Sequence, residues 1–148
     1  MTIRTFQELY DSFCAATGTA PQELEEDDEG CAAFSAELRG VTVNVMHTVD
    51  SHPDSAFVLV DFGPPPEEQE AEAFRRLLMT NFTMLGQEPA SAFSIHPVYG
   101  NVMLQATYPF EQHSGEHLLR SLRALAELAL RWRETHFLEE ASADGERR

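Results

Sequence analysis

The most informative hydrophobic pattern lies between Glu67 and Leu85, where apolar residues recur at helical spacing over a wide arc. The arc consists of a main stripe and two residues beside it: Ala71, Phe74, Leu78, Phe82 and Leu85, with Leu77 and Met84. It spans roughly 160°, whereas a surface helix needs only ~100° to pack on one sheet. We therefore expect two apolar neighbours for this helix, its own sheet and a second copy of the chain. A helix buried more deeply within a monomer is the alternative.

A short amphipathic helix is predicted near the start of the chain. Thr5 and Glu8 fit a capping box, in which the two side chains satisfy the first free amides of a helix. Apolar residues recur at helical spacing around this box: Ile3, Phe6, Leu9, Tyr10, Phe13 and Cys14. Gly18 is a natural end, because glycine adopts the left-handed conformation at low cost. The next segment, Pro21–Gly30, is an acidic connector whose carboxylates lack the spacing of a calcium loop.

The hydrophobic period then changes to two, which indicates β-strands. Ala32–Leu38 and Val41–Val49 are predicted to form a hairpin. Valines share one face of the second arm and the other face is mixed, as in an antiparallel sheet that is covered on one side. A third strand, Ala56–Phe62, is apolar on both faces except at Asp61, so we expect it to be central. Pro64–Pro66 separates this strand from the wide-arc helix.

Two short strands, Ala92–His96 and Val102–Tyr108, and a final helix from Ser114 complete the predicted order. The final helix carries an apolar stripe and outward-facing arginines: Leu118, Leu122, Leu125, Ala129 and Trp132, with Arg120, Arg123, Arg131 and Arg133. We predict a single α+β domain over residues 1–138, followed by a polar tail over residues 139–148. Its order is helix, three strands, helix, two strands, helix, with an antiparallel sheet packed by helices.

Composition narrows the classes of partner. The 148 residues include ten basic and 25 acidic side chains, and the net charge of −15 argues against nucleic acid or an anionic membrane as partner. No opening run resembles a signal peptide, and no apolar stretch is long enough to span a bilayer. Cys14 and Cys31 form no recognisable framework. We expect buried free thiols in a reducing cytoplasm, with a structural pair as the alternative.

The sequence offers no motif of a catalytic, phosphate-binding or metalloprotease site. His113 and His117 could face the same way at a helix start, but zinc needs a third ligand that the sequence does not name. Surface or capping histidines are therefore the preferred interpretation. Cys14 is expected to be a core thiol and His47 a hydrogen-bonded core or groove residue. We predict no catalytic residue, no cofactor and no bound metal.

Four features follow one another in a recognisable order. They are the short aromatic first helix, Phe57–Gly63 before the prolines, Leu77-Leu78-Met79-Thr80-Asn81-Phe82 in the wide-arc helix, and Val102–Pro109 before the last helix. Over roughly residues 3–137, this order in an acidic chain resembles the class I type III secretion chaperones, the CesT/Tir-chaperone family. Leu77, Leu78 and Asn81 are similar to a Leu-Leu-x-x-Asn signature in the family's dimer helix.

The resemblance implies a bacterial, cytoplasmic homodimer that lacks enzymatic activity and holds the N-terminal segment of a secreted effector ready for export. Together with the wide arc, it places the dimer interface at Leu77, Leu78, Asn81, Phe82 and Leu85. It also agrees with an apolar groove between the first helix and the Val41–Val49 strand, where we expect the effector-binding residues Phe6, Leu9, Tyr10, Phe13, Val43 and Val45. A small dimeric ligand-binding or regulatory domain with a sheet-and-helix pocket is the alternative function, followed by an unrecognised enzyme.

Overall fold

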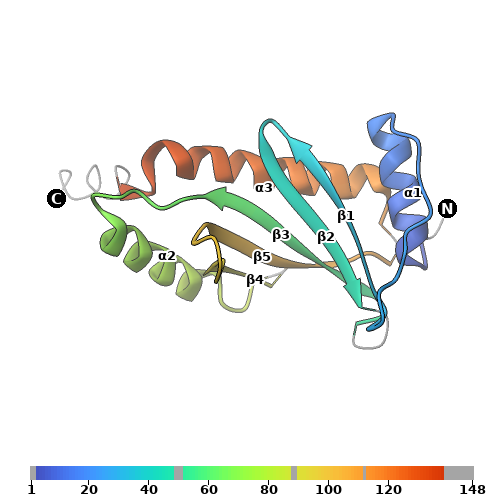
Figure 1. Cartoon of the computed structure of the whole chain (residues 1–148), viewed down its shortest axis with the longest axis horizontal. Helices are drawn as coiled ribbons and strands as arrows, with labels where there is room; N and C mark the ends of the chain where they lie inside the picture. Colours follow the sequence, from blue (N-terminus) through green and yellow to red (C-terminus); the bar gives the residue numbers. More distant parts are fainter. Residues whose placement is uncertain (1–2, 49–51, 88–89, 112, 139–148) are drawn as a thin grey trace.

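The computed structural model describes residues 3–48, 52–87, 90–111 and 113–138 (Figure 1). Its element order is the predicted one: α1 (Phe6–Thr17), β1 (Cys31–Leu38), β2 (Val41–Thr48), β3 (Ser55–Gly63), α2 (Glu70–Met84), β4 (Ser91–Ile95), β5 (Val102–Pro109) and α3 (Gly115–Thr135). The predicted α+β class is thus confirmed. The predicted tail, residues 139–148, lies outside the described residues.

The five strands form one antiparallel sheet in the order β1-β2-β3-β5-β4. β3 lies at the centre, as its two apolar faces predicted, with β2 paired on one side and β5 on the other. The register between β3 and β5 shifts between Asp61 and Gly63. β1 and β4 are the two edges.

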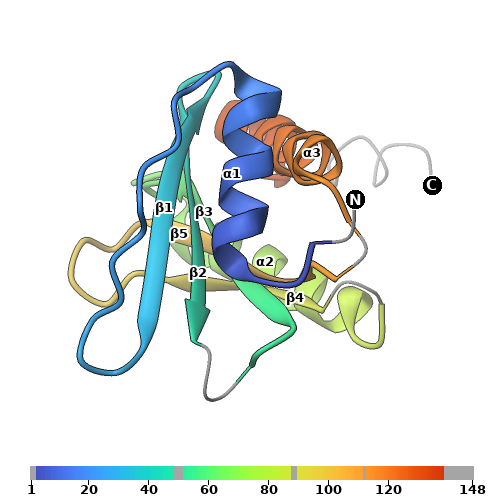
Figure 2. The ribbon, with the colours of Figure 1, turned by 90° about the vertical axis from the view of Figure 1, so that its right-hand side faces the viewer.

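Helices α1 and α3 pack together on the same face of the sheet, and α2 lies beside the edge strand β4 (Figure 2). The inner face of β2 is buried under these helices at Val41, Val43 and Val45. Trp132 of α3 packs on Phe62 of β3 in the same core. These helices therefore cover one face of the sheet, and no helix of the described residues lies on the other.

The capping and glycine signals in the sequence predict the bounds of α1 correctly, but the predicted start of α2 is too early. The predicted capping box is present, since the Glu8 amide donates to the Thr5 hydroxyl at 3.1 Å. Gly18 ends α1 in the left-handed conformation. The wide-arc helix starts at Glu70, three residues later than predicted from Glu67, and its N-cap Gln69 makes no side-chain cap bond. Residues 67–69 form a bend and turn after the prolines instead.

The prediction that all four α3 arginines face outward is wrong for Arg133. Its guanidinium donates to the carbonyl oxygens of Phe62 and Asp61, both at 2.9 Å, and to that of Gly40 at 3.3 Å. These carbonyls lie at the register shift near the end of β3 and at the tip of the β1–β2 hairpin. Arg133 thus joins the end of α3 to the sheet, a role that periodicity cannot indicate.

Gly115, the first residue of α3, lets the two covering helices approach closely. A Cβ at this position would lie 2.1 Å from the Ser12 carbonyl carbon of α1. The Gly115 amide also donates to the Ser12 hydroxyl at 2.8 Å. Any larger residue must push the backbones of α1 and α3 apart.

We expect Gly115→Ala to lower the free energy of unfolding by about 2 kcal/mol or more, because overpacking against backbone outweighs alanine's better helix propensity. Ser12→Ala is the matched control. It removes the hydrogen bond without adding atoms and should cost only about 1 kcal/mol. Urea denaturation measures both, and equal stability of Gly115→Ala and the wild type would contradict the close contact.

Candidate interaction surfaces

Helix α2 presents a stripe of exposed apolar side chains away from the sheet. Leu78, Phe82 and Leu85 expose 68%, 78% and 80% of their surface. Ala73 and Leu77 are buried on the opposite side. The wide arc therefore contributes Leu77 to an inner stripe that packs within the monomer, and its exposed residues form an outer stripe that the described residues leave uncovered. This excludes deeper burial in the monomer as the explanation of the arc.

Asn81 joins α2 to the edge strand β4. Its side-chain oxygen accepts from the Phe93 amide at 2.7 Å, and its Nδ2 donates to the Phe93 carbonyl at 3.2 Å. These main-chain groups face the open edge of the sheet, where Asn81 takes the place of a neighbouring strand. A hollow of about 300 Å³ lies beside it, with Leu78 and Ile95 in its apolar lining. Asn81 falls within the apolar arc of α2, and these two bonds satisfy its polar side chain there.

The groove predicted between the first helix and the second strand is closed in this structure. Of the six residues predicted to bind an effector, Tyr10 is half-buried, and these five are buried: Phe6, Leu9, Phe13, Val43 and Val45. Phe6, Tyr10 and Phe13 all pack on Phe34 of β1, so aromatic rings fill the space between helix and sheet. Contact of these residues with an effector stays a prediction, and it would require α1 to move.

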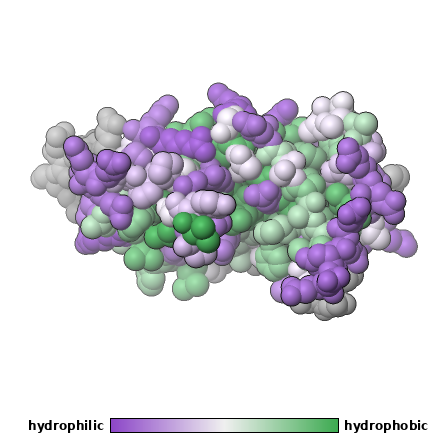
Figure 3. Space-filling model, viewed as in Figure 1, coloured by the Kyte–Doolittle hydropathy of each residue, from purple (hydrophilic) through white to green (hydrophobic). Residues whose placement is uncertain are grey.

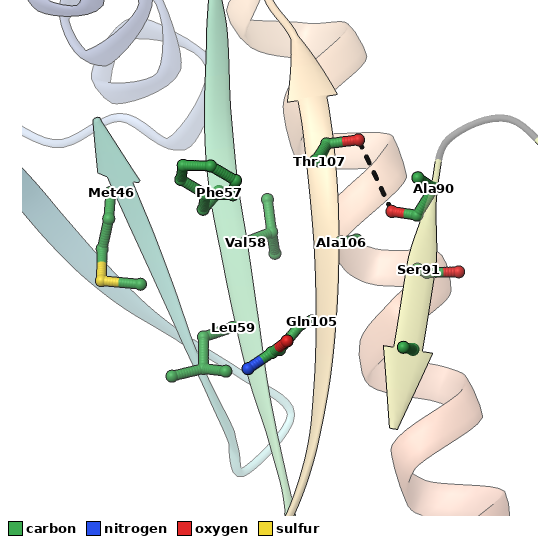
Figure 4. Close-up of a pocket in the computed structure, with 10 residues that line it drawn as sticks. Met46, Phe57, Val58, Leu59, Ala90, Ser91, Gln105, Ala106 and Thr107 are labelled. Atoms are coloured by element: carbon green, nitrogen blue, oxygen red, sulfur yellow. Dashed lines mark hydrogen bonds between the residues drawn. The ribbon is translucent and has the colours of Figure 1, made fainter. Parts of the chain in front are cut away.

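The open apolar surface lies on the opposite face of the sheet. Its half-buried side chains include Met46 of β2 and Phe57 and Leu59 of β3, and Figure 4 shows them on the side of the strands away from α3. They line a hollow of about 430 Å³ with Gln105 and Thr107 of β5. Figure 3 shows apolar side chains gathered over the strands, with hydrophilic ones around them. We call the surface of Met46, Phe57, Leu59, Gln105 and Thr107 the open sheet face.

The sequence pattern also indicates the open sheet face, which is separate from the groove predicted under the first helix. The third strand is apolar on both faces, and only one of them can meet the helices. Phe57 and Leu59 occupy the other face, beside Met46 on the mixed face of β2. Two adjacent strands with apolar residues on their outer faces indicate a surface that a partner can cover.

The acidic connector borders the sheet at its β1 edge. Gln7 of α1 anchors it, accepting from the Leu24 amide at 3.0 Å and donating to the Gln22 carbonyl at 3.2 Å. Within the described residues, the connector bonds to β1 through the Asp27 amide, which donates to the Cys31 carbonyl at 3.0 Å. The outer edge of β1 beyond this point has no main-chain partner in the described part of the chain.

A histidine pair lies where β5 passes into α3. The rings of His113 and His117 are stacked, with centroids 4.1 Å apart and planes 5° apart. The Tyr108 hydroxyl lies 2.7 Å from Nδ1 of His117. Burial raises the pKa of Tyr108 to about 12 against the opposing effect of Arg120. Burial, His113 and Arg120 together lower the pKa of His117 below its usual value.

The remaining candidates are structural. His47 is buried and hydrogen-bonded to the Pro53 carbonyl at 3.2 Å, which confirms the expectation of a bonded core residue. Cys14 is buried and free, and Cys31 is half-buried and free, so the alternative of a disulfide is wrong. Within the described residues, no three His, Cys, Asp or Glu side chains form a possible metal site. None of the described helices has the length and apolar character needed to cross a membrane.

Chains of three solved complexes share this fold, and one of the three is a chaperone–effector complex. A chain of the ExsC–ExsE complex is 19% identical with a TM-score of 0.67, and the match covers 86% of this chain and 90% of that one. A chain of the HopA1–SchA chaperone–effector complex is 18% identical with a TM-score of 0.60, and the match covers 87% of this chain and 93% of that one. A chain of the ExoT–SpcS complex from Pseudomonas aeruginosa is 12% identical with a TM-score of 0.55, and the match covers 85% of this chain and 95% of that one. At these identities the likeness shows a shared fold.

The model of the Tir chaperone protein (CesT) family matches residues 8–133. The chain therefore belongs to this family, as the order of its sequence features predicted. A search of curated proteins finds no match.

Asn81→Ala should lower the free energy of unfolding by about 1–2 kcal/mol, because it leaves the amide and carbonyl of Phe93 without their side-chain partner. Thr83→Ala, on the exposed side of α2, is the control and should change stability by less than about 0.5 kcal/mol. Hydrogen exchange provides a local readout, in which the Phe93 amide loses protection in the Asn81 variant. Unchanged protection would contradict the proposed bridge.

Proposed function

We propose that this member of the CesT family is a type III secretion chaperone that binds the N-terminal region of a secreted effector and keeps it soluble and export-competent. The observation that carries the proposal is the open sheet face, an apolar surface that none of the three helices covers. Family membership and a fold shared with chaperone–effector complexes support it. We also propose a cytoplasmic protein without catalytic activity, in keeping with a family of chaperones.

The effector segment is proposed to bind in an extended form. Met46, Phe57 and Leu59 offer apolar contacts on the open sheet face, and the β1 edge offers unpaired main-chain groups. An extended segment can use both, because its side chains fill apolar hollows while its backbone pairs with a sheet edge. The net charge of −15 favours a basic segment and speeds its encounter with the chaperone.

The functional unit is proposed to be a homodimer formed through α2. Its outer stripe of Leu78, Phe82 and Leu85 is too apolar to stay in water, and the adjacent hollow beside β4 can receive a side chain from a second copy. A two-fold contact is self-complementary, so each residue acts twice. The exposed stripe of one α2 would then cover that of its partner.

Leu78→Asp should convert the dimer of about 33 kDa (2 × 16.6 kDa) into monomer or aggregate. The two-fold axis introduces the buried charge as two like charges that lack partners. Light scattering measures the mass. Val98→Asp is the matched control, because Val98 is similarly exposed but lies on the β4–β5 loop, and this variant should stay dimeric. A monomer mass for the wild type would rule out the proposed dimer.

Phe57→Ser and Leu59→Gln should each weaken effector binding about tenfold, which corresponds to the ~1.4 kcal/mol of one lost apolar contact. The effector is first identified by affinity purification of the wild-type chain from its native host. Titration with the N-terminal segment of that effector then gives the dissociation constants. Val98→Gln is the control for a polar change at an exposed apolar residue.

Two results would count against this proposal. Purification that yields no secreted protein would oppose the chaperone function itself. Binding that is unchanged in both strand variants, with thermal stability also unchanged, would place the effector elsewhere.

A further inference from the structure

A second groove lies on the helix-bearing side of the sheet. β5 forms its floor, α3 forms one wall and the end of α2 forms the other. Its volume is about 510 Å³, and we call it the α3 groove. It differs from the open sheet face because it lies beside α3, on the face that α1 and α3 partly cover.

Most of the α3 groove is apolar. Leu125 and Leu128 of α3 face Leu104 and Ala106 of β5 across it, and Met84 of α2 closes the other side. The sequence pattern placed Leu125 in the buried stripe of the last helix, but the structure leaves it half-buried at this groove. A second apolar stripe of α3 therefore lacks full cover from the described residues.

One end of the α3 groove is polar and rich in hydrogen-bond donors. Tyr108, His113 and His117 line this end, and Arg120 follows one turn along α3. Arg120 is close enough to Tyr108 and His117 to act on the pKa of both. Among the described residues, neither Arg120 nor the His113 ring has an ion pair or a side-chain hydrogen bond.

The protonation states at this end follow from the contacts. The pKa of Tyr108, about 12, keeps its hydroxyl protonated at neutral pH, so this hydroxyl can donate to Nδ1 of His117. A neutral His117 then carries its hydrogen on Nε2, as a donor. The guanidinium of Arg120 acts on the pKa of both Tyr108 and His117. In a chain of net charge −15, this end is suited to an anionic group.

We propose that the α3 groove binds an amphipathic helix of the client protein, whose apolar face covers Leu125 and Leu128 and whose aspartate or glutamate contacts His113, His117 and Arg120. The proposal rests on the proposed chaperone function and adds a second contact site with its own charge preference. An arginine in this position can bind a carboxylate through two parallel hydrogen bonds.

The backbone of the floor favours a helix over an extended segment. β5 is paired with β3 on one side and β4 on the other, so its main-chain groups are already bonded. An extended segment would therefore leave its own amides without partners here, whereas a helix bonds its backbone internally. From His117 to Leu128 the α3 wall is about 16 Å long at ~1.5 Å per residue, enough for about three helical turns.

The carboxylate contact makes binding pH-dependent. A bound carboxylate favours protonated histidine, and the unbound chain holds the pKa of His117 below its usual value. Affinity for an acidic helix should therefore rise as the pH falls from 8 to 6, while the carboxylate of the helix stays ionised. His113 of the β5–α3 connection, Tyr108 of β5, and Arg120 and Ser121 of α3 lie around His117, and the carboxylate of Glu116 directly precedes it on α3.

The test is selection of a random peptide library on the full-length wild-type chain, followed by titration of enriched peptides. The net charge of the chain alone would select basic peptides. The α3 groove should instead select peptides with apolar residues at spacings of three and four and an Asp or Glu at one end. Arg120→Gln should weaken such a peptide about tenfold, and changing its acidic residue to the amide should have a smaller effect in that variant than in the wild type. Arg123→Gln, an exposed arginine on the same helix, is the control.

The remaining outcomes would overturn the proposal. Selection of basic or purely apolar peptides, or of none that respond to Arg120→Gln, contradicts the acidic helix. Dodecanoate that binds with the same Arg120 dependence, while no peptide is enriched, would identify a small amphiphile as the ligand. An identified effector that binds Arg120→Gln as tightly as wild type refutes only this site and leaves the chaperone function standing.

Discussion

The contact between α1 and α3 at Gly115 determines how the sheet is covered. Because Gly115 has no side chain, the two helices can pack against each other on one face of the five strands. Aromatic residues of α1 and the apolar stripe of α3 then fill the space above β1, β2 and β3. The opposite face receives no helix from the described residues, and its apolar side chains stay open there. The position of the proposed effector site is thus a consequence of where the helices are.

Helix α2 is held at the edge of the sheet by a polar interaction. Asn81 bonds both main-chain groups of Phe93, which fixes the helix beside β4 and closes that edge at this point. The inner stripe of α2 is thereby used within the monomer, and Leu78, Phe82 and Leu85 face outward. Asn81 of the Leu-Leu-x-x-Asn sequence therefore orients the helix, and the exposed residues Leu78, Phe82 and Leu85 provide the proposed dimer surface.

Charge is distributed unevenly over the chain. Acidic residues concentrate in the connector before β1 and at the start of α2, whereas α3 carries four of the ten basic residues, all arginines. Arg133 uses its charge within the fold, on carbonyl oxygens at the end of the sheet. Arg120 lies beside an apolar groove at the other end of the helix. A strongly acidic protein can thus attract a basic client segment at one surface and accept an acidic residue at another.

The sequence by itself determined the elements, their order and the family, because caps, turns and hydrophobic periods act between residues close in the chain. It also indicated that α2 has more apolar surface than one sheet can cover. It did not show which apolar residues are exposed: Leu9 and Val43, predicted to line a groove, are buried, while Phe57 and Leu59 lie on the open sheet face. Alternation shows which side of a strand is apolar, but which side a helix covers depends on contacts between distant segments. Only the tertiary structure decided that, as it decided the roles of Asn81, Gly115 and Arg133.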